Sequence, residues 1–315
     1  MGLFPRPTDA YELGLPVGPK SNVYYVDPAN GNDSLSGTSP KKPLRTITAA
    51  YAKCTANQHD VVAYIAGSSS ISLTDTLTWA KNYTHLVGLA APTFAENRAR
   101  IFAHEDNEDK SPLVEFSGTG CIVKDLMIFN GPDDADCLVN VLVSGGRNYF
   151  ENVHFAGGGH ATNAIAGASS LAIEDCGGNT FRHCTIGLDT IAATSTQTAL
   201  HLDDNVRRTV FEDCRFTLRA SADTVKFVDV EDATAIASYV DFVNCLFYNT
   251  STTTTMTEAF TVPASMQADA RITLRGCGFV GATDIEGENR GEVLADMSAI
   301  TAGGTAGLLQ ATNTT

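Results

Sequence analysis

The run His-Leu-Asp-Asp-Asn at 201–205 holds the side chains best suited to chemistry. Glycosidic hydrolysis needs two carboxyl groups that face one bond across about 5 to 10 Å. His201 stands between two leucines, so in a strand its side chain points away from theirs. Asp203 and Asp204 are sequence neighbours that favour a turn, where adjacent carboxylates are common. A hydrolytic site would need a further carboxylate from a neighbouring strand, and the nearest candidates are Glu174 and Asp229.

The other polar groups do not assemble into a site. Calcium could bind oxygen ligands in two acidic loops, one with Asp133, Asp134 and Asp136 and the other with Asp27, Asn30, Asn32 and Asp33. Neither loop has the EF-hand spacing, so a solvated loop is the favoured interpretation. The histidines are scattered, and no Ser/His/Asp or Cys/His set can be assembled. The sequence therefore predicts no catalytic, cofactor-binding or metal-binding residues.

One short phrase is repeated six times at nearly constant spacing. The copies are VKDLMI (123–128), FENVHF (150–155), FRHCTI (181–186), FEDCRF (211–216), FVNCLF (242–247) and LRGCGF (274–279). Their fourth positions are Leu126, Val153, Cys184, Cys214, Cys245 and Cys277, separated by 27, 31, 30, 31 and 32 residues. A fixed period of this length indicates a solenoid, in which each unit stacks on its neighbours.

Each repeat unit is predicted to be strand, turn, strand, bend and loop. Apolar residues alternate within each phrase up to a bend at its third position, which His183 occupies in one copy and Asp, Asn or Gly in others. We therefore expect His183 to be a turn residue. About thirty residues per unit leave no room for a helix between strands, so the units form a parallel β-helix with strands about 4.8 Å apart.

A further copy at 86–89 brings the column to about seven rungs. This copy lies 37 residues before Leu126, and we attribute the excess length to the acidic loop 104–109.

The N-terminal region predicts a strand near Val23–Val26 and a helix from Ile47 to about Asn57, with Thr46 as its N-cap. Such a helix would cover the open end of the first rung. The stretch matches Tyr-Val-Asp-Pro at 25–28, Gly-x-Asp at 31–33, Gly-Thr-x-Pro at 37–40 and Thr-Ile-x-x-Ala at 46–50. With the repeats, it resembles the pectin-lyase-like right-handed parallel β-helix proteins. The resemblance implies that fold, which carbohydrate lyases, hydrolases, adhesins and bacteriophage tailspikes share, and no single activity.

Composition limits the class of partner. The chain has 36 acidic and 21 basic residues, a net charge of −15 and no basic stripe, so nucleic acid is not an expected ligand. No apolar run reaches membrane-spanning length, and we expect no membrane partner. Without an export signal, its eight cysteines are expected to be free thiols. Cys184, Cys214, Cys245 and Cys277 share one repeat position and should form a buried, unbridged ladder.

Both ends of the chain suggest attachment to a partner. The division predicted is an extended N-terminal arm (1–21), a cap (22–60), the β-helix (61–282) and a C-terminal tail (283–315). The arm carries four prolines and apolar side chains, namely Leu3, Phe4, Tyr11, Leu13 and Leu15, and the tail offers Leu294, Ile300, Leu308 and Leu309 as anchors.

These features predict a non-enzymatic bacteriophage virion protein, assembled in the host cytoplasm. It would be a homo-oligomeric, trimeric capsid decoration, cement or spike subunit that contacts a major capsid or tail protein. Two alternatives stay open: a tailspike-type polysaccharide depolymerase, either hydrolase or lyase, and a carbohydrate-binding adhesin that contacts a host surface glycan. Clustered outward carboxylates with aromatic sugar platforms would favour the enzyme, and the chain has one tryptophan, Trp79.

Overall fold

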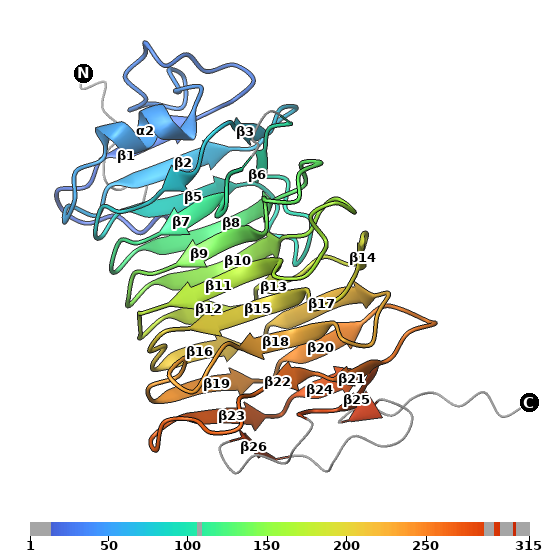
Figure 1. Ribbon diagram of the computed structural model, residues 1–315. Helices are drawn as coiled ribbons and strands as arrows, with labels where there is room; N and C mark the ends of the chain where they lie inside the picture. Colours follow the sequence, from blue (N-terminus) through green and yellow to red (C-terminus); the bar gives the residue numbers. More distant parts are fainter. Residues whose placement is uncertain (1–13, 106–108, 287–292, 297–304, 307–315) are drawn as a thin grey trace, which may run out of the picture.

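The computed structural model describes residues 14–105, 109–286, 293–296 and 305–306, and within them the chain folds as a parallel β-solenoid of about seven turns (Figure 1). One wall is a seven-stranded sheet in which every neighbouring pair is parallel. Its strands, in spatial order, are β4 (Leu77–Thr78), β7 (Val114–Phe116), β9 (Val139–Val143), β11 (Ser169–Glu174), β15 (Thr198–Asp203), β18 (Lys226–Val230) and β22 (Phe260–Thr261).

The remaining walls come from a larger sheet that bends once in each rung. Before the bend lie β1 (Val23–Val26), β2 (Val61–Ile65), β5 (His85–Leu89), β8 (Ile122–Phe129), β10 (Tyr149–Ala156), β12 (Thr180–Arg182), β16 (Thr209–Glu212), β19 (Tyr239–Val243), β23 (Arg271–Arg275) and β26 (Val293–Ala295). After it lie β3 (Ile71–Leu73), β6 (Arg100–Ala103), β13 (Thr185–Ile186), β17 (Arg215–Ala220), β20 (Leu246–Asn249) and β24 (Gly278–Val280), while β8 and β10 run through the bend.

Four short strands complete the described chain. They are β14 (Ala192–Ala193), β21 (Met256–Glu258), β25 (Ala282–Asp284) and β27 (Thr305–Ala306), and β27 pairs antiparallel with β24. The parallel β-helix expected from the repeats is therefore confirmed, while its right-handed turn stays a prediction.

The bend is made by one left-handed residue in each rung. Asp125, Asn152, His183, Asp213 and Asn244 have φ values of 58°, 53°, 51°, 52° and 53°, and Gly276 has 63°. Asp, Asn and Gly tolerate this conformation best, which explains the residue types at the third position of the phrase. The prediction that His183 is a turn residue is confirmed.

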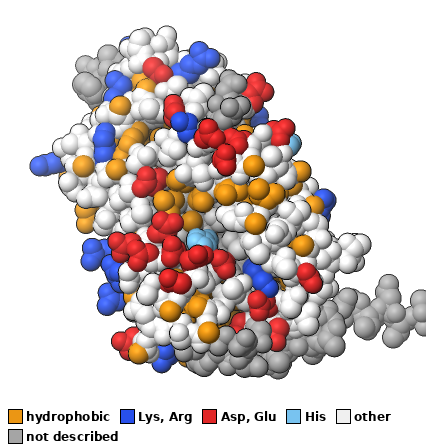
Figure 2. All heavy atoms as spheres, in the orientation of Figure 1, with side chains coloured by type: hydrophobic (Ala, Val, Ile, Leu, Met, Phe, Trp, Pro, Cys, Tyr) orange, Lys and Arg blue, Asp and Glu red, His pale blue; other side chains and the backbone are white. Residues whose placement is uncertain are grey.

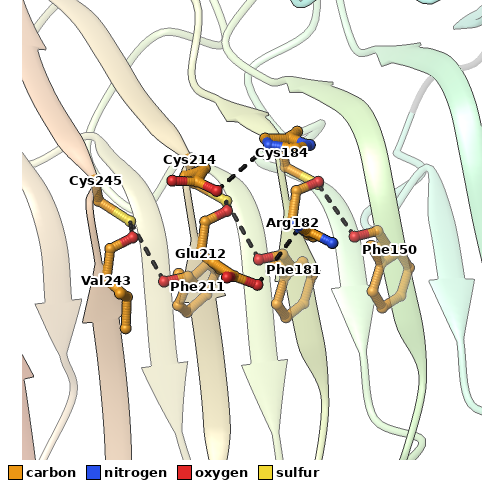
Figure 3. Close-up of polar contacts among 11 residues, drawn as sticks. Phe150, Phe181, Arg182, Cys184, Phe211, Glu212, Cys214, Val243 and Cys245 are labelled. Carbon is orange, nitrogen blue, oxygen red and sulfur yellow. Dashed lines mark hydrogen bonds and ion pairs between the residues drawn. The ribbon is translucent and has the colours of Figure 1, made fainter.

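Identical side chains stack along the interior (Figure 3). The rings of Phe150, Phe181, Phe211 and Phe242 lie 4.7, 4.7 and 5.0 Å apart between centroids and are nearly parallel. The predicted cysteine ladder is confirmed, since Cys184, Cys214, Cys245 and Cys277 are free and buried. Each thiol donates to the carbonyl of a phenylalanine one rung back, as Cys214 does to Phe181 at 3.4 Å.

The predicted helix is present but shorter than expected. Helix α2 (Ile47–Lys53) lies at the N-terminal end of the column beside β1, and its N-cap Thr46 accepts a hydrogen bond from the Ala49 amide (Figure 1). The helix ends before Asn57 because the backbone becomes extended at Cys54, after which the buried Asp60 carboxylate accepts the amide of Thr55. Its role as a cap stays a prediction.

The extra length of the early rung was assigned to the wrong loop. Leu86 pairs with Val123, whereas Arg100 on the other side of the bend pairs with Met127. Ten additional residues are therefore inserted at the bend itself, around 90–99, and not in the acidic loop 104–109. Of that loop, residues 106–108 lie outside the described residues.

The structure corrects one expectation about the ends. Leu15, placed in the predicted arm, is buried against Tyr25, Val61 and Ala63 of the chain's own sheet. Leu294 lies on β26 and is 51% exposed, and its role as an anchor stays a prediction. Leu3, Phe4, Tyr11, Leu13, Ile300, Leu308 and Leu309 lie outside the described residues, and the division into arm, cap, column and tail stays a prediction.

Candidate functional site

His201 is the centre of a charged cluster on the outward face of the seven-stranded sheet. On this face the in-register row runs Glu115, Leu142, Ala172, His201, Asp229 and Thr261. His201 Nδ1 lies 3.1 Å from the Asp229 carboxylate, and Nε2 lies 3.9 Å from that of Glu231. Figure 2 shows acidic side chains gathered around a histidine on one face of the molecule. The prediction that His201 points outward is confirmed.

Strand β15 ends at Asp203, and Asp204 begins the turn that the sequence predicted. Asp204 and Asn205 have φ values of 47° and 56°, and the Asp204 amide donates to the Asp203 carboxylate at 2.8 Å. Glu174 on β11 pairs directly with Asp203, as its register suggested. Asp229 pairs with His201 instead. The carboxylates that flank Asp203 on the neighbouring strands are thus Glu174 on one side and Glu231 on the other. Glu231 follows Val230, which pairs with Leu202.

Two groups in this cluster have perturbed proton affinities. Burial lowers the pKa of His201, but the hydrogen bond and charge of Asp229, helped by Glu231 and Asp203, outweigh burial and raise it. Partial burial raises the pKa of Glu174, and the negative charge of Asp203 raises it further. Glu174 is therefore the carboxyl group in this cluster that is best suited to hold a proton.

The arrangement allows two kinds of chemistry. Glu174 and Asp203 lie on adjacent strands, so their separation of about one strand spacing approaches the 5 Å that retaining glycosidases use. The ligand atoms of His201, Asp229 and Glu231 lie within 4.8 Å of one another, which is compatible with a divalent cation. No aromatic side chain stands in the outward row named above, so it has no stacking platform for a sugar ring.

The calcium candidates use their oxygens to order loops. Asp134 accepts the amides of Asp136 and Asp109, and these three carboxylates form the second close acidic group among the described residues. Asp133 accepts a hydrogen bond from Thr162 and pairs with His160 at 3.2 Å. These contacts are those of ordered turns.

The acidic residues of the N-terminal loop act in the same way. Asp33 accepts the amides of Arg45 and Thr46, and Asp27 accepts those of Ala29 and Asn30. Asn32 accepts the amide of Ser34, and the side chain of Asn30 donates to Asp27.

Sequence reasoning missed Glu231 and the insertion at 90–99. The signal for Glu231 was its alternation with Asp229, which puts both on the outward face. In the insertion, Phe94 and Pro92 form a hollow of about 250 Å³ with Asp125, Glu151, Asn152 and His183. It is fastened by hydrogen bonds from Asn97 to the Asn152 carbonyl and from the Glu96 amide to His154. The pairing register locates this insertion, and its hydrogen bonds to Leu126, Asn152 and Thr185 show that it folds over three later rungs.

Comparison with known proteins adds information on the fold. No protein-family model and no curated protein sequence matches the chain. Among solved structures, the pectate lyase Pel9A is 13% identical, with a TM-score of 0.50, covering 89% of this chain and 80% of its own. A pectin methylesterase in complex with hexasaccharide VII is 17% identical, with a TM-score of 0.50 and coverage of 90% and 84%. Geobacillus virus E2 ORF18 is 13% identical, with a TM-score of 0.47 and coverage of 76% and 49%.

The fold is a pectin-lyase-like parallel β-helix. Identities of 13% and 17% establish the likeness of fold and carry no activity to this chain. Within the described residues, no helix is long and apolar enough to cross a membrane.

Proposed function

We propose that this chain is a non-enzymatic structural subunit of a bacteriophage particle, a trimeric capsid decoration, cement or spike protein. The observation that carries the proposal is the filled interior, in which stacked phenylalanine and cysteine side chains run through successive rungs. Such a column presents its outward side chains as an extended surface that other proteins can contact.

The cysteines support assembly in a reducing compartment. All eight are free and buried, and burial raises the pKa of Cys214, so its thiol stays neutral. Free thiols persist in the cytosol, where bacteriophage particles are built. This chemistry favours a protein assembled before the host cell opens.

The acidic cluster supports a contact surface more than an active site. Its carboxylates lie on an open strand face, and two of them pair with His201. Three hollows in the described surface, of about 640, 400 and 250 Å³, are lined by other residues.

Two experiments test the structural role. Immunogold electron microscopy of particles purified from the bacterium or lysate that expresses this gene should label the particles, and sedimentation of the pure chain should give a trimer. A protein found only in the soluble fraction would contradict the proposal. Deleting residues 1–13 while keeping Leu15 should leave the column folded but reduce incorporation into particles, because Leu15 already packs on the chain's own sheet.

A depolymerase is the second candidate, favoured by one observation. Glu174, whose pKa is raised by partial burial and by the charge of Asp203, pairs with Asp203 and so puts two carboxyl groups on adjacent strands. Release of reducing ends or unsaturated products from host surface glycans measures this activity. Turnover that is lost in both Glu174→Gln and Asp203→Asn, but kept in Asp269→Asn, which changes an exposed carboxylate outside the cluster, would replace the structural proposal with the enzyme.

A further inference from the structure

A polar hollow of about 400 Å³ lies along one edge of the column, at the turns that follow the strands of the seven-stranded sheet. Four successive turns line it, each of which leads from the seven-stranded sheet to the larger sheet. They contribute Ser117 and Thr119, then 144–147, then 175–178, and finally Arg207 and Arg208. The hollow is therefore built by the repeat itself, from residues about thirty positions apart.

Three arginines dominate the lining. Arg147, Arg207 and Arg208 are exposed, and Asp175 is the acidic residue that accompanies them. In the described part of the chain, none of the three guanidinium groups lies within ion-pair distance of a carboxylate, whereas Arg182 and Arg275 each have such a partner. The one side-chain hydrogen bond recorded for them joins Arg207 to the Asn205 carbonyl at 3.1 Å.

The glycine turn between the arginines brings them together. A Cβ on Gly177 would lie 2.4 Å from Cγ of Arg207, and one on Gly178 would lie 3.4 Å from Cγ of Arg147. The stems of both arginines therefore lie against this turn, one from the preceding rung and one from the following rung. Side chains at Gly177 would displace Arg207, so the absence of a Cβ shapes the hollow.

The charge of the hollow opposes that of the molecule. The chain carries a net charge of −15, yet these turns hold three arginines against two carboxylates, Asp175 in the lining and Asp204 in the same turn as Arg207 and Arg208. Figure 2 shows Lys and Arg side chains grouped at an edge of the molecule beside an acidic region. Three like charges that have no carboxylate partner repel one another, and an anion between them would remove that repulsion.

We propose that this arginine hollow binds a phosphate group, either as free phosphate or as part of a phosphorylated polymer. Three arginines line this hollow, and guanidinium forks donate in pairs to phosphate oxygens. The hydroxyl of Thr119, which also lines the hollow, supplies a further donor, whereas that of Ser144 donates to the Glu115 carboxylate at 3.2 Å. A carboxylate, with one charge and two oxygens, would leave part of this donor set unused. The site is independent of the proposed structural role.

Titration calorimetry of the full chain with inorganic phosphate, at constant ionic strength, tests the proposal. We expect saturable binding that weakens about tenfold in Arg147→Gln and in Arg208→Gln, because each removes a charge-assisted hydrogen-bond donor. Arg219→Gln is the matched control. Arg219 is exposed on β17, so this substitution removes the same charge at a position outside the hollow. Absence of binding, or an equal loss in Arg219→Gln, would overturn the proposal. Circular dichroism should show all three variants folded.

Two further probes separate the sources of the ligand. Acetate should bind at least tenfold more weakly than phosphate, and equal affinity would refute recognition of a dianion. A glycerol-phosphate oligomer that binds more tightly than inorganic phosphate would assign the site to a phosphorylated polymer. An oligomer that fails to displace phosphate would assign it to the free ion.

Discussion

The phenylalanine row inside the column and the acidic pair Glu174 and Asp203 on its outward face both stack in register. The stacking stabilises the first and destabilises the second. Inside, Phe150, Phe181 and Phe211 stack at 4.7 Å because identical apolar rings attract at strand spacing. Outside, Glu174 stands directly over Asp203, and like charges at that spacing repel. In a solenoid, repetition of an apolar residue in the core therefore stabilises the fold, whereas repetition of one charge on the surface destabilises it.

On the larger sheet, repulsion between like charges is avoided because opposite charges alternate from rung to rung. Lys124, Glu151, Arg182 and Glu212 follow one another in register on its outward face. Lys124 pairs with Glu151 at 2.7 Å and Arg182 with Glu212 at 3.5 Å. Charges alternate on this face and accumulate on the face of His201. The accumulated charge is thus a specific feature of one wall and not a property of the repeat.

Breaking the interior row should have the largest effect. Phe211→Ala removes a fully buried ring that stacks on both neighbours, and we expect a loss of about 3–5 kcal/mol in the free energy of unfolding. Denaturant unfolding followed by circular dichroism measures it. Phe211→Leu keeps most of the volume and should cost clearly less. Equal costs for the two variants would show that stacking and volume are not what the position needs.

The cysteine ladder should be next in size. Cys214→Ser places a hydroxyl in an apolar row, and we expect a loss of about 1–3 kcal/mol, to the extent that the Phe181 carbonyl fails to accept from it. Cys214→Ala serves as the control, because it removes the sulfur without adding a polar group. A serine variant as stable as the native chain would mean that the hydroxyl is fully satisfied there.

Sequence reasoning predicted the column because its signals are local and repeated. The alternation, the period and the bend residues such as Asp213 and Asn244 follow from φ preferences and burial. The insertion at 90–99 was misplaced because length alone does not say on which side of a bend residues are added. The arginine hollow was missed because Arg147 and Arg207 meet only through the stacking of rungs, 60 positions apart.

The ion pair between Lys124 and Glu151 on the larger sheet should contribute less to the free energy of unfolding than either interior row. Burial alone would raise the pKa of Glu151, but Lys124 outweighs burial and lowers it. The stability that ionised Glu151 contributes is therefore fully present above its pKa in the unfolded chain, and it is lost as the pH falls through its lower pKa in the folded chain. A double-mutant cycle with Lys124→Met and Glu151→Gln should give about 0.5–1 kcal/mol at pH 7. A coupling energy that does not fall on acidification would contradict an ionic interaction.

Glu174→Gln should give the smallest change, and one of opposite sign. The pKa of Glu174 is raised by partial burial and by Asp203, so its ionised form costs stability at neutral pH. Replacing it should stabilise the fold by a few tenths of a kcal/mol at pH 7, about the size of a relieved like-charge pair. Because the native carboxyl becomes protonated as pH falls through its raised folded pKa, this gain should vanish below the unfolded pKa. Chemical unfolding at several pH values, with Asp269→Asn as the control because it removes an exposed carboxylate outside the cluster, measures the difference. A loss of stability at pH 7 would contradict this prediction, because it would mean that the contacts of Glu174 stabilise the fold more than its repulsion with Asp203 destabilises it.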